Sequence, residues 1–282
     1  FWKAIIDECD PLDGATDGWI SDYNPQSCPF NPETLVGHTV TCPEMDSDSP
    51  VTITAQHATL VKQILQGPDL QDHPDLWTGL PPGASFRGTA NTQVINGSIV
   101  RPVPFFPIIG WIKNFVYRDP DYNVFDMTFD DFNTAYRLTL DGYNGILGSD
   151  DLNLSDFRRA GGKLLTWHGL ADELIPASWT NAFWEGIDKT DGADVDEFYR
   201  IFLAPGLGHC SAGHGPKPVD PLGALVRWVE EGIAPDRLSA AAVKADGKEV
   251  TRELCRYPAT LVYDGHGDVN DAGSFSCRPR EG

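Results

Sequence analysis

The sequence has 282 residues, which is enough for one large domain or two smaller ones with a sizeable core. Its 41 acidic residues outnumber 21 Lys and Arg residues, and the formal net charge is −20. This charge repels nucleic-acid phosphates and anionic lipids, so neither is an expected partner. No apolar run approaches the roughly 20 residues that a membrane-spanning helix needs. With 28 Gly, 22 Pro and 14 Phe residues, the chain is expected to be globular and rich in loops.

Residues 1–150 hold most of the prolines and show irregular spacing. A helix is predicted over 51–66, capped by Thr54, with one apolar face formed by Leu60, Val61, Ile64 and Leu65. A second helix is predicted over 130–140, with Phe132, Tyr136 and Leu140 on one side. Three prolines in the aromatic stretch between these helices argue against regular structure there: Pro102, Pro104 and Pro107.

Residues 151–282 alternate between strand and helix patterns. The predicted elements are a strand over 163–167, a helix over 176–188, a strand over 198–203 and a helix over 219–231. The last helix has Pro221 in its first turn, Gly232 where a C-cap belongs, and one apolar face made by Leu222, Leu225, Val226 and Val229. This alternation predicts an α/β fold with a parallel sheet covered by helices, in which functional residues follow the carboxyl ends of the strands.

Two motifs lie just after these predicted strands. Asp172 ends the run His168-Gly169-Leu170-Ala171-Asp172, and His209 lies in Gly206-Leu207-Gly208-His209-Cys210. An acid followed by a histidine is the second half of the Ser…Asp…His order of α/β-hydrolases. The sequence contains no G-x-S-x-G motif for the serine, so the nucleophile is expected on a polypeptide outside this sequence. Glu173 is the rival of Asp172 for the acidic role.

The cysteines, sequons and first residues favour a secreted, processed protein. Six cysteines without a C-x-x-C pair disfavour zinc and suit disulfides in an oxidising compartment; they lie at positions 9, 28, 42, 210, 255 and 277. N-glycosylation sequons begin at Asn96 and Asn153. The chain opens Phe1-Trp2-Lys3 without a signal peptide, so we expect a processed fragment whose leader lay upstream.

Several stretches carry a shared pattern: residues 9–18, 161–169, 172–176, 198–200, 205–210, 225–230 and 234–238. Together they resemble the tannase/feruloyl esterase family of α/β-hydrolases. The resemblance implies the C-terminal part of an α/β-hydrolase sheet together with a large irregular lid domain. Residues 1–150 would be that lid, opening with a calcium loop, and residues 151–282 the C-terminal half of the catalytic domain.

The resemblance also implies roles and a partner. Asp172 would orient His209, and His209 would act as the general base toward a serine. In the family that serine follows a cysteine, which forms a disulfide with the cysteine after the histidine. Cys210 would therefore bridge to an N-terminal chain of the same precursor, separated by proteolysis.

The acidic stretch at the start of the chain is a candidate calcium site. Asp10, Asp13 and Asp17 lie in a D-x-x-D-G-x-x-D-G pattern, and hard cations prefer several oxygen ligands from a compact turning loop. By resemblance, the backbone carbonyls of Ala15 and Trp19 complete the set, and the Ca²⁺ would be structural. Without the resemblance, an acidic turn-forming loop is the simpler interpretation. A second acidic stretch, 264–271, is interpreted as a surface loop rather than a cation site.

The cysteine pairing stays partly open. If Cys9 pairs with Cys28 and Cys255 with Cys277, then Cys42 and Cys210 either pair with each other or both leave the chain. The family pattern sends Cys210 to the partner chain, which leaves Cys42 free or joined to that chain as well.

The predicted function is a serine carboxylesterase acting on esters of phenolic acids. The tail over 257–277 is more similar to feruloyl esterases of the family than to tannases. Hydrolysis of galloyl esters by a tannase is the alternative within the family. Two alternatives lie outside it: a calcium-stabilised binding module without activity, and a pseudo-enzyme that keeps the acid and the histidine for structural reasons.

Overall fold

The computed structural model describes residues 1–22, 27–41, 50–68, 78–86, 88–95, 99–191 and 194–279. The chain forms two compact units, one made of Phe1–Ser85 with Leu152–Gly282 and one made of Phe86–Asp151. The second boundary between these units lies after Asp151, and the predicted division into a lid and a catalytic half stays a prediction. The smaller unit is shorter than the predicted lid of residues 1–150, because residues 1–85 group with the C-terminal part of the chain.

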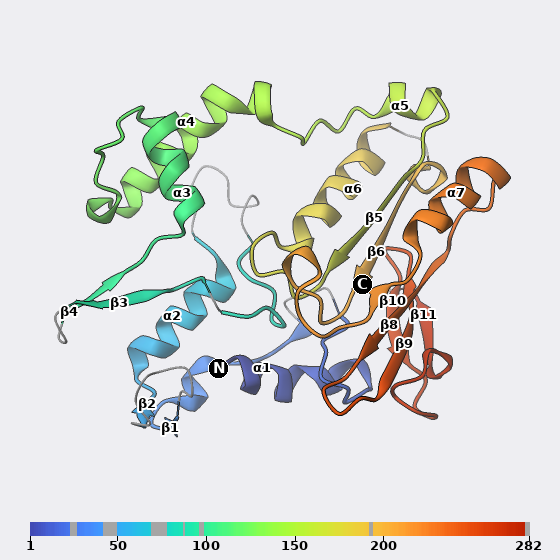
Figure 1. Ribbon diagram of the computed structural model, residues 1–282, viewed down its shortest axis with the longest axis horizontal. Coiled ribbons are helices and arrows are strands. Elements are labelled where there is room, and N and C mark those ends of the chain that lie inside the picture. Colours follow the sequence, from blue (N-terminus) through green and yellow to red (C-terminus); the bar gives the residue numbers. More distant parts are fainter. Residues whose placement is uncertain are drawn as a thin grey trace. The chain divides into compact units, whose positions relative to one another are not determined.

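The central feature of the larger unit is a pair of parallel strands (Figure 1). Strand β5 (Leu164–Gly169) pairs with β6 (Tyr199–Ala204), from Leu164 opposite Tyr199 to Gly169 opposite Ala204. Helix α6 (Ala177–Asp191) connects them and follows a short helix, α5 (Ser155–Arg159), and the strand β5. The predicted strand–helix–strand unit is therefore confirmed.

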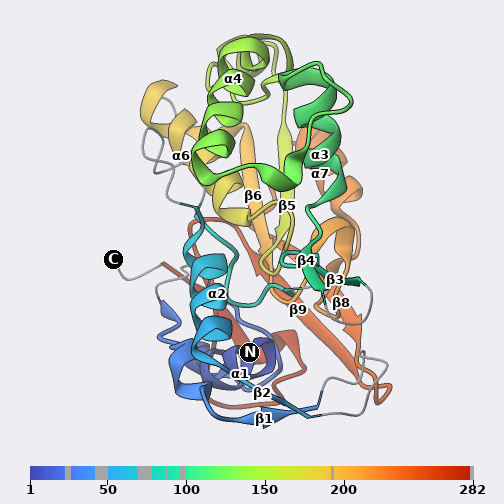
Figure 2. The same ribbon diagram turned by 90° about the vertical axis from the view of Figure 1, so that its left-hand side faces the viewer.

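Two apolar clusters flank this pair of strands. Tyr199 and Ile201 of β6 pack with Trp184 and Ile187 of α6, and the cluster also includes Val195 of the 3₁₀ helix Val195–Glu197. Figures 1 and 2 both show α6 and α7 on opposite sides of β5 and β6. On the α7 side the cluster is Phe202, Ala204, Leu207, Ala224, Leu238, Ala240 and Leu254.

Helix α7 (Pro221–Glu231) forms where predicted. The Asp220 carboxylate accepts a hydrogen bond from the Gly223 backbone N–H at 2.9 Å, and Gly232 ends the helix with φ of 71°. Its buried residues are Ala224 and Trp228, whereas most of the predicted apolar face is exposed: Leu222, Val226 and Val229. This part of α7 thus carries an apolar stripe that the described residues leave uncovered.

The C-terminal part of the larger unit is an antiparallel β region that the sequence pattern did not predict. Strands β7 (Lys217–Pro218), β8 (Arg237–Val243) and β9 (Glu249–Cys255) form one sheet, and β10 (Thr260–Tyr263) pairs with β11 (Phe275–Arg278). The 3₁₀ helix Ala272–Ser274 leads into β11. The strand β8 reads Arg-Leu-Ser-Ala-Ala-Ala-Val, and its small residues give only a weak strand signal.

The first part of the larger unit is mostly helical. It contains α1 (Trp2–Cys9), the 3₁₀ helices Asp10–Asp13 and Pro32–Leu35, the short strands β1 (Thr39–Val40) and β2 (Val51–Thr52), and α2 (Ala55–Gln66). Helix α2 confirms the helix predicted over 51–66, although it begins only at Ala55. Thr54 is its cap, because its hydroxyl accepts the His57 N–H while His57 Nδ1 accepts the Thr54 N–H.

The smaller unit corrects the prediction made from its prolines. Strands β3 (Thr92–Ile95) and β4 (Ile99–Pro102) form an antiparallel hairpin, and α3 (Phe106–Trp111) follows. Pro102 ends a strand in a two-stranded sheet, and Pro107 lies in the first turn of α3, where no backbone N–H is needed. After the π turn Ile112–Val116 and the 3₁₀ helix Val124–Asp126 comes α4 (Phe129–Leu147), which is longer than predicted. Within the described ranges, no helix combines the length and apolar character needed to span a bilayer.

Candidate active site

The loops that follow β5 and β6 are bonded to each other. The Leu170 N–H donates to the Ala204 carbonyl and the Ala171 N–H to the Leu207 carbonyl, both at 2.9 Å. A side chain at Gly169 would place a Cβ only 2.2 Å from the Leu207 oxygen, so this approach requires glycine. The arrangement brings the segments after the two strands together, as the topology predicted.

Asp172 and His209 meet at this edge of the sheet. His209 Nδ1 lies 3.3 Å from both carboxylate oxygens of Asp172. Asp172 is 5% exposed, and His209 is half-buried in the 3₁₀ turn His209–Ser211. His209 Nε2 makes no hydrogen bond to any described residue, so this nitrogen is available to a group from elsewhere. The convergence of these two side chains was expected from the sequence.

Asp172 is held as a carboxylate. Its Oδ1 accepts the backbone N–H of Leu174 at 2.9 Å and that of Ile175 at 2.8 Å. Burial raises the pKa of Asp172, but the contact with His168 and these two N–H groups outweigh burial and lower the pKa to about 2. The group is therefore negatively charged across the physiological range, which suits an acid that orients a histidine.

Glu173, the rival acid, contacts the backbone of His209 and not its ring. Its Oε2 accepts the His209 N–H at 3.2 Å. Gly208 makes room for this contact, because a Cβ there would come within 2.7 Å of the same oxygen. The two residues after His209 adopt left-handed backbone, with φ of 51° at Cys210 and 65° at Ser211. Glu173 thus helps fix a tight, strained turn that carries His209.

His168 is a site residue to which the sequence gave no role. It lies 3.4 Å from Asp172 Oδ2 through Nε2, while its Nδ1 lies 2.8 Å from the Thr180 hydroxyl. The i, i+4 spacing of His168 and Asp172 was visible in the sequence. Nothing in the pattern, however, showed that the strand end would turn both side chains toward the same point.

Among the described cysteines, four form disulfides and one is free. Cys9 is disulfide-bonded to Cys28, and Cys255 to Cys277. Cys210 is exposed and is the cysteine without a disulfide among those that the structure describes. Cys42 lies outside the described residues, and so does the sequon at Asn96. The other sequon residue, Asn153, is exposed.

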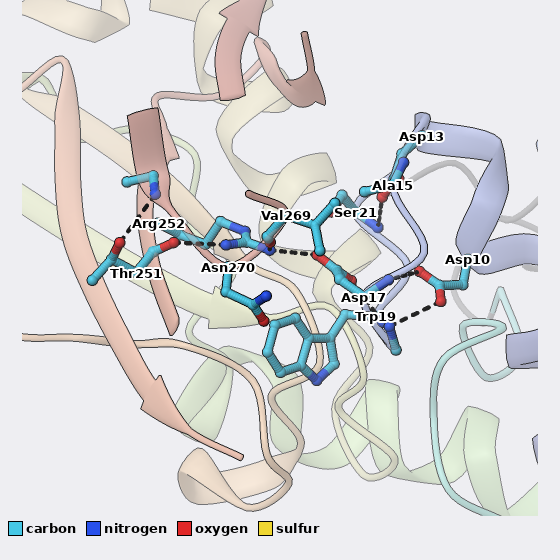
Figure 3. A network of polar contacts seen from close by, with 12 residues as sticks. Asp10, Asp13, Ala15, Asp17, Trp19, Ser21, Thr251, Arg252, Val269 and Asn270 are labelled. Carbon is cyan, nitrogen blue, oxygen red and sulfur yellow. Dashed lines mark hydrogen bonds and ion pairs between the residues drawn. The ribbon is translucent and has the colours of Figure 1, made fainter. Parts of the chain in front are cut away.

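In the acidic loop, residues 10–21, backbone N–H groups donate hydrogen bonds to the aspartate side chains (Figure 3). The Asp10 carboxylate accepts the N–H groups of Asp17 and Gly18, and the Asp13 carboxylate accepts those of Ala15 and Ser21. Burial raises the pKa of Asp13 to about 6 and also raises that of Asp10. The loop therefore holds buried carboxylates whose charge the surroundings compensate poorly.

Two cations face this loop: Lys244 Nζ donates to the Asp17 carbonyl at 3.0 Å, and Arg252 reaches the Asp17 carboxylate. The Arg252 guanidinium extends from β9 and also donates to the carbonyls of Val269 and Thr251, at 2.6 and 2.7 Å (Figure 3). It lies 4.0 Å from the centre of the Phe275 ring, and only 2% of Arg252 is exposed. One buried arginine thus offsets one of three acidic side chains.

The donor chemistry of this loop fits a hard cation. Three carboxylates lie within eight residues, and the carbonyl oxygens of Ala15 and Trp19 accept no hydrogen bond from the described residues. The side chains are not gathered around one point, since the described ranges contain no group of three or more His, Cys, Asp or Glu residues placed to hold a metal ion. Calcium at this loop stays a prediction.

The stretch 264–271 is the connection between β10 and β11. Residues from Gly265 to Asp268 are exposed, and Asp264 accepts hydrogen bonds from Ser276 and Arg278. These contacts are those of a surface loop tied to β11, in agreement with the interpretation from the sequence.

Comparison with known proteins identifies the family. The sequence model described as "Tannase and feruloyl esterase" matches residues 1–278. The chain is 41% identical to a probable feruloyl esterase from Arthroderma benhamiae, over 98% of this chain and 51% of that protein. It therefore belongs to the tannase and feruloyl esterase family. It also spans only about half the length of the curated relatives it matches.

Solved structures show the same fold. Feruloyl esterase B from Aspergillus oryzae superimposes with a TM-score of 0.78 at 26% identity, over 98% of this chain and 56% of that one. A tannin acyl hydrolase from Aspergillus niger gives a TM-score of 0.86 at 22% identity, over 99% of this chain and 52% of that one. The expectation of an α/β-hydrolase-like fold is thus confirmed, whereas the role of residues 1–150 as a lid stays a prediction.

Proposed function

We propose that this chain is the C-terminal part of a serine esterase that hydrolyses esters of phenolic acids, with feruloyl and related hydroxycinnamoyl esters as its substrates. The observation that carries the proposal is the pairing of His209 Nδ1 with both oxygens of Asp172 at 3.3 Å. It lies after two neighbouring parallel strands, where α/β-hydrolases hold these groups. The names of the relatives support the choice of substrate class.

In the proposed reaction, His209 takes the proton of a serine hydroxyl through Nε2. The serine oxygen then attacks the ester carbonyl, and His209 returns the proton to the departing alcohol. Water then attacks the acyl carbonyl while His209 takes its proton, and His209 gives that proton to the serine oxygen as the carboxylic acid is released. Asp172 holds the Nδ1 proton of His209 and stabilises the imidazolium that forms, which its low pKa allows.

The serine is supplied by an N-terminal chain of the same precursor. Two features of the larger unit support such a partner. Within the described residues β5 pairs only with β6, so its other edge is open to a further strand. The apolar stripe of α7 is also uncovered, with Leu222 70% exposed and Val229 58% exposed. The exposed thiol of Cys210 is the proposed bridge to the cysteine beside the serine.

A structural Ca²⁺ and a secreted location complete the proposal. Asp10, Asp13 and Asp17, with the carbonyls of Ala15 and Trp19, would hold the ion and offset the buried negative charge of the loop. The two disulfides favour an oxidising compartment, and the exposed Asn153 is accessible for glycosylation there. The ion takes no part in the chemistry.

Hydrolysis of methyl ferulate and methyl gallate, measured side by side with the native two-part protein, tests the proposed function. We expect methyl ferulate to be cleaved with the higher kcat/KM. Preference for methyl gallate would instead support the galloyl alternative, which the description of the family also names. Absence of hydrolysis with both esters would favour a binding module without activity.

Mass spectrometry of the same protein with and without reductant tests the partner. We expect a disulfide-linked species larger than this chain, which reduction separates. A single unlinked species that cleaves esters at the mass of this chain would contradict the two-part arrangement.

A further inference from the structure

The His168 ring is clamped at three points beside the proposed relay. His168 lies in β5, and its Nδ1 contacts the Thr180 hydroxyl of α6 at 2.8 Å. Its Nε2 lies 2.9 Å from the backbone carbonyl of Ile175 and 3.4 Å from Asp172 Oδ2. The side chain is 14% exposed, so the ring has little freedom to turn toward solvent.

The Ile175 carbonyl fixes the proton on this ring. A carbonyl oxygen only accepts hydrogen bonds, so Nε2 must carry a hydrogen whichever charge the ring has. The edge of the ring that bears this N–H therefore faces the Asp172 carboxylate as well. Thr180 suits this arrangement because its hydroxyl is able to donate to an unprotonated Nδ1 or accept from a protonated one.

The Asp172 carboxylate has polar partners on three sides. Its Oδ1 accepts the N–H groups of Leu174 and Ile175, and its Oδ2 faces the N–H edge of His168. The remaining side meets His209 Nδ1. Without the His168 contact, the Asp172 carboxylate would be free to rotate toward its two backbone donors. Its two oxygens would then no longer lie at equal distances from His209 Nδ1.

We infer that His168 is a positioning residue of the reaction, which holds the Asp172 carboxylate in the orientation that pairs it with His209. The inference rests on the proposed esterase function. The polar contacts of the His168 ring among the described residues are with Thr180, Ile175 and Asp172, so His168 would act on His209 through Asp172. The titratable groups around Asp172 are His168 and His209 at the carboxylate, with Glu173 at the backbone of His209.

The test uses the native two-part protein and methyl ferulate. In H168F, which keeps a ring but removes both nitrogens, we expect kcat to fall about tenfold to a hundredfold with KM unchanged, as small misplacements of catalytic groups do. H168Q, whose amide is able to donate near the Nε2 position, should recover part of the loss. T180V removes one hydrogen bond from the ring, and its kcat should fall about fivefold.

A cycle with D172N separates positioning from general stability. In the D172N background, H168F should lower kcat no further, because the group through which His168 acts is already gone. A role in packing alone would instead lower activity by the same factor in both backgrounds. The proton resonance of His209 Nδ1–H should also shift in H168F and return toward its original position in H168Q.

Two kinds of failure are distinguishable. If D172N and H209A hydrolyse methyl ferulate at the normal rate, the proposed function is wrong. If D172N is inactive while H168F, with an unchanged circular dichroism spectrum, keeps the normal kcat and the normal His209 resonance, the inference about His168 is wrong. Should H168F not fold, the same readouts in H168Q and T180V decide, and a normal kcat in T180V with an unmoved resonance would overturn it.

Discussion

The larger unit holds two groups of carboxylates, and the pKa values of Asp172 and Asp13 in them are shifted in opposite directions. The pKa of Asp172 is about 2, whereas that of Asp13 is about 6. Each carboxylate accepts two backbone N–H groups. At Asp172 the contact with the His168 ring also lowers the pKa. At Asp13 burial outweighs the hydrogen bonds, and the nearby Asp17 carboxylate, which pairs with Arg252, raises the pKa further.

Two backbone N–H donors therefore do not by themselves keep the pKa of a buried carboxylate low. Burial raises the pKa of both groups. At Asp172 the contact with His168 and the two backbone N–H groups outweigh burial, whereas at Asp13 the backbone N–H groups and the Ser21 hydroxyl do not. The corner around Asp172 is thus built to keep an acid ionised next to His209. The loop around Asp13 is instead short of positive charge, which a bound cation would supply.

Removing either member of the Asp172–His209 pair should have the largest effect. We expect D172N and H209A to lower kcat for methyl ferulate by about 10³-fold to 10⁴-fold with the fold intact, because the tautomer or the base is lost. Steady-state kinetics with circular dichroism checks this. The matched controls D246N and H266A change exposed turn residues and should keep normal rates. Equal rates in the site variants and these controls would contradict the account.

Breaking the buried pair in the acidic loop should have the next largest effect. R252M leaves the Asp17 carboxylate buried and unpaired, and we expect a loss of about 3–5 kcal/mol in the free energy of unfolding. Denaturant unfolding measures this. The double variant R252M/D17N should recover much of the loss, since no unpaired charge remains, and R237Q on the exposed part of β8 is the control. Equal losses in the single and double variants would refute the pairing argument.

Removal of calcium should lower the thermal stability through the acidic loop and not through Asp172. At Ca²⁺ a hundredfold above its Kd, the ion stabilises the folded state by about 3 kcal/mol, so a chelator should lower Tm. D13N should lower the gain in Tm that added Ca²⁺ produces, whereas D172N should keep it. Thermal unfolding with and without chelator measures this effect. A Tm that the chelator leaves unchanged would contradict the proposed calcium site.

The pH dependence of stability should report the smallest effect. Because the pKa of Asp172 is lowered on folding, its contribution is present above about pH 4 and is lost as the pH falls toward about 2. The contribution is on the order of 2 kcal/mol. The difference in unfolding free energy between the native protein and D172N should therefore shrink between pH 5 and pH 2. A difference that stays constant over this range would contradict the lowered pKa.

Local patterns in the sequence were sufficient for part of this structure. Alternating strands and helices predicted that Asp172 and His209 would meet, because parallel strands end at the same edge of a sheet. Thr54 and Gly232 marked helix ends through chemistry that depends only on neighbouring residues. The conditional pairing of Cys9 with Cys28 and of Cys255 with Cys277 is the one that forms.

Contacts between distant segments were beyond reach of the sequence. Arg252 and Asp17 are 235 residues apart, and no periodicity relates them. The small residues of β8 give a weak strand signal, and β8 forms a strand because it pairs with β9. His168 was visible, yet its contact with Asp172 depends on how the strand ends and on Thr180 in the following helix.

The central claim is that Asp172 and His209 activate a serine that lies outside this chain. Labelling the native two-part protein with a serine-reactive fluorophosphonate, followed by peptide mapping, tests it most directly. The account predicts one labelled serine, located in the N-terminal chain next to a cysteine, and labelling slowed at least a hundredfold in H209A. A label on a serine of this chain, or labelling that proceeds at the same rate without the His209 ring, would contradict it.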